Sequence, residues 1–153
     1  MATYEREWLC QRIVEDAPDA IIFADRDGVI RLWNAGAQAV FGYQPEEALG
    51  QTLDLIVPER LRERHWDGFR RVIATGVTRY GRDQLLAVPA IGKDGGRISV
   101  EFSIVMLRDP AGDPLGIAAI LRDVSQRWQE QQRMRKRLAA LEAMSAPRPP
   151  GSA

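Results

Sequence analysis

The first part of the chain changes from helical to strand-like spacing of its apolar residues. Residues 4–16 place their apolar side chains on one stripe at helical spacing, which predicts a helix. Pro18 ends this helix, because proline disfavours helical geometry in the residue before it. The apolar segments 20–24 and 29–33 predict two short strands, and the Asp-Arg-Asp-Gly turn at 25–28 joins them into a hairpin.

The middle of the chain predicts a series of helices. Asn34 is a suitable N-cap for a short helix over 35–41. A proline followed by two glutamates predicts a further helical turn at 45–47. Pro58 then opens a longer helix over roughly 58–74, whose apolar residues lie close to one face.

Three longer β segments follow, at 80–91, 97–107 and 115–122. A Lys-Asp-Gly-Gly sequence separates the first two, and an Asp-Pro-Ala-Gly-Asp sequence separates the second from the third, as expected of tight turns. The middle segment alternates apolar and polar side chains, which indicates a half-buried strand.

The last helix predicted by the sequence covers 124–144, which contains neither glycine nor proline. Its apolar residues Met134, Leu138 and Leu141 lie 4 and 3 positions apart, a short coiled-coil spacing. We expect the proline-rich tail, 146–153, to be disordered.

The order of these elements predicts an α+β fold in which one sheet carries helices on one side. The sequence therefore divides into a flanking helix at 1–17, one domain at 18–123, an exit helix at 124–145 and the tail at 146–153.

Composition excludes several functional classes. The 153 residues are 45% hydrophobic and 27% charged, as in an ordinary globular domain. Lys plus Arg and Asp plus Glu both number 21, so no net charge attracts nucleic acid or an anionic membrane. No apolar run approaches the roughly 20 residues of a membrane span, and the acidic N-terminus lacks an apolar secretory core, so we expect a cytoplasmic protein.

The chain has one histidine, His65, and one cysteine, Cys10. This count excludes an intrachain disulfide, a zinc cluster and a His–Cys nucleophile within one copy. No Gly-x-Ser-x-Gly elbow or phosphate-binding Gly-Lys-Ser/Thr loop is present, so we expect a regulatory module and no enzyme. His65 remains as a single base, a single metal ligand or an ordinary packed residue.

Several short motifs follow one another along the chain. They are Asp-Arg-Asp-Gly-Val-Ile at 25–30, Trp-Asn-Ala-Gly-Ala at 33–37, Phe-Gly-Tyr at 41–43, Lys-Asp-Gly at 93–95 and Leu-Arg-Asp-Val-Ser at 121–125. Together they resemble the PAS family. The resemblance covers about residues 8 to 126. It implies a five-stranded antiparallel sheet in the order 2-1-5-4-3, a small cavity between sheet and helices, and a flanking helix that relays a signal.

Within this family, the segment around His65 resembles the haem-binding PAS domains of the FixL oxygen-sensor family. The resemblance implies that haem b is the cofactor and that His65 is the axial ligand of its iron. It also implies that Arg71 lies near a haem propionate and that Arg82 contacts a diatomic gas. Tyr80 and Phe102 are bulkier than the aliphatic residues usual in that family, which would narrow the distal pocket.

Haem also needs apolar walls, and the candidates lie just before or on the long predicted helix and on the three longer β segments. They are Ile56, Leu61, Phe69, Val72, Leu86, Phe102, Ile104, Leu115 and Ile120.

Two functions therefore remain open. One is a haem sensor of oxygen or another diatomic gas, which relays the change through the helices at 4–16 and 124–144 to a homodimer, a sensor kinase or a transcriptional partner. The other is a cofactor-free dimerisation or interaction module, or a sensor of a small apolar ligand, in which His65 is an ordinary packed residue. A flavin–cysteine adduct is excluded, because Cys10 lies outside the expected domain core.

Overall fold

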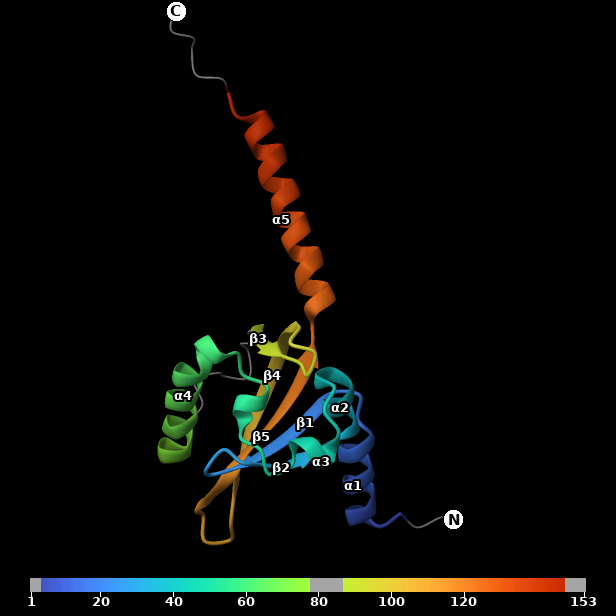
Figure 1. Cartoon of the computed structure of the whole chain (residues 1–153), viewed down its shortest axis with the longest axis vertical. Coiled ribbons are helices and arrows are strands. Elements are labelled where there is room, and N and C mark those ends of the chain that lie inside the picture. The colour runs from blue at the N-terminus through green and yellow to red at the C-terminus, as the bar shows by residue number, and fades with distance from the viewer. Residues whose placement is uncertain (1–3, 78–86, 148–153) are drawn as a thin grey trace, which may run out of the picture.

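A computed structural model describes residues 4–77 and 87–147. Its centre is an antiparallel sheet of five strands in the order β2-β1-β5-β4-β3 (Figure 1). The strands are β1 (Ala20–Asp25), β2 (Ile30–Trp33), β3 (Val88–Ile91), β4 (Arg97–Arg108) and β5 (Pro114–Asp123). The α+β class and the strand order that the resemblance implied are both confirmed.

The helices follow the predicted order, and α5 projects away from the sheet (Figure 1). They are α1 (Arg6–Asp16), α2 (Ala35–Phe41), α3 (Pro45–Ala48), the 3-10 turns η1 (Leu53–Leu55) and η2 (Glu59–Leu61), α4 (Arg62–Thr75) and α5 (Ser125–Ser145). The predicted helix at 58–74 thus starts as a 3-10 turn. The predicted strand at 80–91 is described only from Val88, since 80–86 lie outside the described residues.

Residue parity along the strands separates a buried face from an outer face. Ile22, Val100 and Leu121 point into the main core, where Phe41 of α2 and Ala48 of α3 pack against them. A second, smaller cluster joins Ala24 and Ile117 on the same face of the sheet to Phe69 of α4. The helices α2, α3 and α4 therefore cover one face, as the pattern predicted.

Asn34 fixes the entry of the chain into the sheet. Its side-chain oxygen accepts hydrogen bonds from the backbone nitrogens of Ala37 (2.9 Å) and Ile21 (2.8 Å), and so caps α2 as predicted. Its amide nitrogen donates to the backbone oxygens of Val14 (2.8 Å) and Asp19 (3.0 Å). This side chain is only 4% exposed, so its bonds replace lost contacts with water and connect α1, β1 and α2.

Two properties concern the described ranges as a whole. None of the helices there combines the length and the apolar character that a membrane span requires. No three His, Cys, Asp or Glu side chains gather there as a metal site.

Candidate functional site

His65 lies in the first half of α4, on the side of the helix that faces the second apolar cluster. Phe69, one turn further along, is buried against Ala24 and Ile117 of the sheet. Val72 follows on the same stripe and packs on this cluster as well. His65 shares this face because Phe69 and Val72 follow it four and seven positions later, at helical spacing.

Two aromatic rings lie against the imidazole of His65, which as a residue is half-buried. The ring centroid of Trp66 lies 5.0 Å from that of His65, with the planes at 72°, and the Phe69 centroid lies 6.2 Å away. Trp66 and Phe69 also meet edge to face at 5.4 Å. These contacts are apolar, and His65 Nδ1 is buried without a hydrogen-bond partner among the described residues. A buried polar atom of this kind costs free energy unless something binds it.

Burial lowers the pKa of His65 below its ordinary value of 6.5, and the nearby charge of Asp54 opposes this shift more weakly. Because desolvation disfavours the imidazolium, the side chain is neutral at neutral pH. A neutral imidazole has a lone pair free to bind a metal ion or accept a hydrogen bond.

Asp54 and Arg62 hold the start of α4 in place. The indole nitrogen of Trp66 donates to Asp54 Oδ1 at 2.8 Å. The Arg62 guanidinium donates to the backbone oxygens of Asp54 and Val57, each at 3.2 Å. The turn at Gly28 packs under the Trp66 ring, since a Cβ at Gly28 would lie 2.2 Å from two of its carbons. These contacts fix the rotation of α4 and with it the direction of His65.

Six of the nine predicted wall residues are buried or half-buried. Phe69, Val72 and Ile104 lie together in the cluster beside α4. Ile56 and Phe102 belong to the main core, and Leu61 is half-buried at the end of η2.

Two wall predictions are wrong. Ile120 pairs with Ser103 and Ile21 on the outer face of the sheet and is 41% exposed, whereas Ala119 and Leu121 beside it point inward. Leu115 is 47% exposed near the turn between β4 and β5 and belongs to neither cluster. Strand alternation explains the error at Ile120, because a shift of one position moves a side chain to the other face.

Of the polar residues predicted for the site, Arg71 is among the described residues. Arg71 is exposed on α4, six positions after His65, and so lies off the stripe of His65, Phe69 and Val72. Tyr80, Arg82 and Leu86, the other residues predicted for the site, lie outside the described residues.

Sequence reasoning offered packing against Trp66 as one alternative for His65, but it missed Asp54 and Leu53. Leu53 packs against both apolar clusters and so joins them, although a single leucine in a short turn gives no periodic signal. The Trp66–Asp54 hydrogen bond spans 12 positions and depends on where η1 lies relative to α4.

A compact joint links the sheet to α5. The backbone nitrogen of Val124 donates to Ser99 of β4 at 2.8 Å, and the nitrogen of Ser99 donates to Ser125 Oγ at 3.0 Å. Asp123 Oδ1 accepts from the backbone nitrogen of Ser125 at 2.9 Å and from its hydroxyl at 2.6 Å. Arg127 forms an ion pair with Glu101 of β4. A change in β4 or β5 would therefore act directly on the first turn of α5.

His65 does not line either of two hollows on the described part of the chain. One, of about 180 Å³, lies between η2 and β3 and is lined by Pro58, Arg60, Ile91 and Arg97, among others. The other lies along α5.

Comparison with known proteins agrees with this architecture. A family model described as "PAS fold" matches residues 14–129. The crystal structure of the PAS domain of a protein from Colwellia psychrerythraea matches this fold with a TM-score of 0.69 at 20% sequence identity. The match covers 80% of this chain and 99% of that one. At this identity the match supports the fold alone.

Three curated relatives match most of this chain. A protein of Azorhizobium caulinodans is 34% identical over 116 residues, which are 75% of this chain and 15% of that protein. The sensor protein FixL of Bradyrhizobium diazoefficiens is 29% identical over 134 residues, 86% of this chain and 25% of FixL. The oxygen sensor protein DosP of Escherichia coli is 26% identical over 129 residues, 84% of this chain and 16% of DosP. The chain thus spans a quarter or less of the length of these relatives.

Proposed function

This chain belongs to the PAS family, and from that premise we propose that it is a sensory domain that binds haem b through His65 and detects oxygen or another diatomic gas. Residues 18–123 form the sensory unit in this proposal, with flanking helices at 1–17 and 124–145. The chain then acts as a regulatory module, and its output depends on a partner.

One observation carries the proposal: His65 Nδ1 is buried among aromatic rings and has no hydrogen-bond partner among the described residues. Burial keeps the ring neutral. A neutral imidazole that faces an apolar cluster from a helix fits the role of an axial haem ligand. Because Nδ1 is buried without a partner, a bound group that the protein itself does not supply would remove the free-energy cost of this atom.

Haem bound here would supply an iron centre whose electronic state responds to a diatomic gas. His65 would hold the iron, and Phe69, Val72 and Ile104 would exclude water from one side of the ring. Arg71, exposed on the same helix, would bind a propionate at the surface. The family resemblance assigns the contact with the gas to Arg82.

A signal from this site has a short route to α5. Ile104 lies on β4, and the same strand carries Ser99 and Glu101, which contact the first turn of α5. A displacement of β4 would therefore change the direction of the exit helix. We propose that α1 and α5 pass this change to a homodimer, and through it to a sensor kinase or a transcriptional partner.

The names of two relatives support a sensory role. FixL is a sensor protein, and DosP is an oxygen sensor protein. Both match this chain over more than four fifths of its length.

A second candidate is a cofactor-free PAS module for dimerisation or protein interaction, or for a small apolar ligand. The observation that favours it is the close packing of Trp66 and Phe69 against His65. In this candidate a water molecule or a small ligand binds Nδ1, and signalling depends on the flanking helices alone.

An absorption spectrum of the purified chain, titrated with haemin between about 350 and 650 nm, separates the two candidates. We expect a sharp Soret band that shifts on reduction and again with carbon monoxide. The His65→Ala variant should lose this spectrum, whereas Arg64→Ala, with its exposed side chain on the same helix, should keep it. Circular dichroism checks that both variants fold.

Two results would contradict the haem proposal. One is a spectrum of the parent chain that stays that of free haemin. The other is equal haemin affinity in the parent chain and in a folded His65→Ala variant, which would remove His65 from the site.

A further inference from the structure

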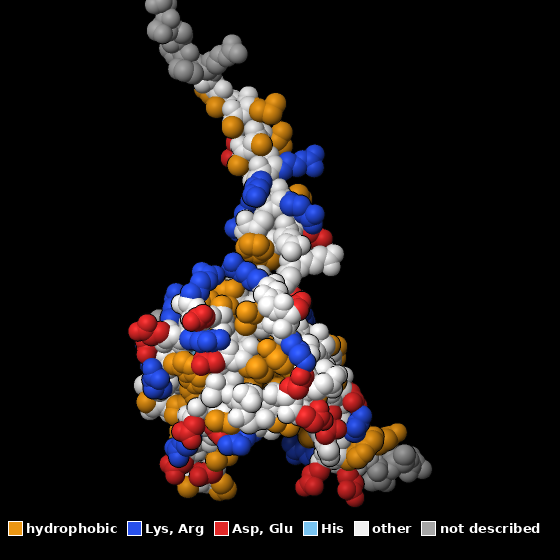
Figure 2. All heavy atoms as spheres, viewed as in Figure 1, with side chains coloured by type: hydrophobic (Ala, Val, Ile, Leu, Met, Phe, Trp, Pro, Cys, Tyr) orange, Lys and Arg blue, Asp and Glu red, His pale blue; other side chains and the backbone are white. Residues whose placement is uncertain are grey.

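The exit helix α5 has an apolar surface that its own chain does not cover. Met134, Leu138 and Leu141 are 68%, 58% and 57% exposed, and no residue of α5 is buried. The helix extends for 21 residues, about 31 Å, away from the domain (Figure 1). Figure 2 shows apolar and charged side chains along this projecting part. A single helix of this length is marginally stable in water, so it gains most from a partner.

The exposed apolar residues follow a heptad repeat. Gln131, Met134, Leu138 and Leu141 are spaced 3, 4 and 3 apart, which are alternate a and d positions; we call these four residues the seam. Gln131 is then a polar residue at an a position, and such residues specify how two helices align.

Four charged residues flank the seam. Glu130 and Arg137 occupy g positions, and Arg135 and Glu142 occupy e positions. None of the four forms an ion pair within the described part of the chain, although Arg127, one turn earlier, is held by Glu101. Their charges are therefore available to a second helix.

We infer that α5 pairs with α5 of a second copy of this chain in a parallel, in-register coiled coil. In that arrangement each g residue faces the e residue five positions later in the other copy. Glu130 then faces Arg135 of the second copy, and Arg137 faces Glu142 of the second copy. Both pairs occur twice by symmetry, so the charges along both edges are complementary.

The antiparallel alternative is disfavoured by the same residues. Suppose that the two helices run in opposite directions and that Met134 of one copy packs against Leu138 of the other. Each e position then faces an e position of the second copy, and each g position faces a g position. Arg135 then lies opposite Arg135 of the second copy, and Arg137 opposite Arg137. Like charges at these positions oppose pairing.

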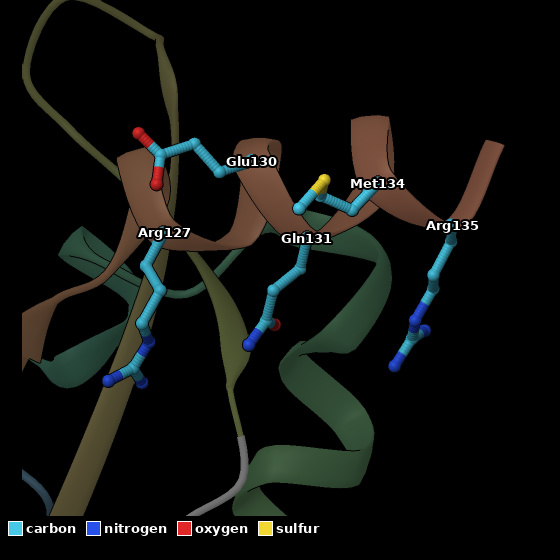
Figure 3. A pocket seen from close by; sticks show the side chains of 5 residues that line it. All are labelled: Arg127, Glu130, Gln131, Met134 and Arg135. Carbon is cyan, nitrogen blue, oxygen red and sulfur yellow. The ribbon is translucent and has the colours of Figure 1, made fainter. Parts of the chain in front are cut away.

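The residues that this packing would bring together line one shallow, open hollow along α5. It is bounded by Arg127, Glu130, Gln131, Met134 and Arg135, all on α5 itself. In a parallel coiled coil, the Gln131 side chain of one helix enters a hole between four residues of the other, at positions 127, 130, 131 and 134. All four line the hollow. Figure 3 shows the side chains of Arg127, Gln131 and Arg135 extending to the same side of the helix.

This inference rests on the homodimer in the proposed function, but its test does not depend on haem. Sedimentation of the full chain over a range of concentrations, with and without haemin, should show a reversible dimer. Arg135→Glu removes two pairs and adds two Glu–Glu contacts, so it should weaken the dimer at least roughly tenfold. The double variant Glu130→Arg plus Arg135→Glu should restore the affinity to within about threefold.

Three outcomes of sedimentation would overturn the pairing: a chain that stays monomeric, a dimer unaffected by Arg135→Glu, or a double variant as weak as the single one. A colourless protein that dimerises as described would contradict the haem proposal and leave the pairing intact. A haem-binding monomer would do the reverse.

Disulfide trapping tests the direction of the helices separately. With Cys10→Ser as the background, Leu141→Cys places one thiol per copy at a d position, where parallel in-register helices bring the two together. Oxidised glutathione should then trap a covalent dimer. Ala143→Cys, on the far side of the helix, is the matched control and should cross-link much more slowly. Equal rates for the two variants would overturn the inference.

Discussion

The indole nitrogen of Trp66 donates a hydrogen bond to Asp54 Oδ1 over 2.8 Å, and this bond ties α4 to the turn η1. Trp66 directly follows His65 on α4, so the contacts that fix the rotation of the helix at Trp66 also fix the direction of the imidazole. The Trp66 ring is held from below by Gly28, in the turn of the first hairpin. The direction of the candidate site is thus set by two segments that precede α4 in the chain.

Trp66→Phe should destabilise the protein by about 1 kcal/mol beyond the cost of its smaller ring, because the hydrogen bond to Asp54 is lost. Asp54→Asn keeps an acceptor oxygen and should cost less. Asp67→Asn, which affects only an exposed pair with Arg70 on the same helix, is the control and should cost at most about 0.5 kcal/mol. Urea unfolding measures all three. Equal losses for Asp54→Asn and Asp54→Ala would contradict the role of the acceptor.

Two neighbouring residues of β5 test the correction at Ile120. Leu121 is buried in the main core, whereas Ile120 lies on the outer face. Leu121→Ala should therefore destabilise the protein by about 2–5 kcal/mol, and Ile120→Ala by about 1 kcal/mol or less. Chemical denaturation at low protein concentration gives both values. A larger loss at Ile120 would mean that the register of β5 is wrong.

The sequence predicted the fold well because local signals and family motifs agreed. The turn at 25–28 and the cap at Asn34 depend on side chains bonding to nearby backbone, and both are found. Alternation along β4 also identified Ile104 as an inward residue. Such features need only a few consecutive positions.

The site was harder to predict because it depends on contacts between distant segments. The alternation that places Ile104 inward places Ile120 outward, because Ile120 pairs with Ser103 whereas Ile104 pairs with Ala119, yet the apolar character of Ile120 alone suggests a wall residue. Asp54 was overlooked, because nothing in the sequence of η1 indicates that it meets Trp66 on α4. Leu53 was missed for the same reason, since it joins two clusters built from different elements.

Acid stability should depend on the contact between Asp19, at the start of the sheet, and Arg122 near its end. The hydrogen bonds from Arg122 hold the pKa of the Asp19 carboxyl below its ordinary value of 3.8, against the effect of burial. The Asp19 carboxyl therefore binds a proton less readily in the folded state than in the unfolded state. Its contribution is therefore present above pH 3.8 and is lost as the pH falls through the lower pKa of the folded state.

Asp19→Asn should lower the urea midpoint slightly at neutral pH, since the pair is exposed. This difference from the parent chain should shrink as the pH falls below 3.8. Arg122→Gln should give the same effect, and the double variant should add little to either. A difference that persists unchanged in acid would show that Asp19 contributes through something other than its charge.

Two helical glycines give opposite predictions for the same substitution. A Cβ at Gly36 of α2 would lie 2.0 Å from the backbone oxygen of Asp19 and 2.7 Å from that of Ala17, which cannot move aside without disturbing the junction at Asn34. Gly36→Ala should therefore cost about 1–3 kcal/mol despite the higher helix propensity of alanine. Gly68 of α4 has no described atom within 4 Å of the same position, so Gly68→Ala should stabilise the haem-free protein by about 0.5–1 kcal/mol. Urea unfolding gives the sign of each change directly. If Gly36→Ala were also stabilising, the close contact between α2 and the segment before β1 would be wrong, and with it the way α1 is joined to the sheet.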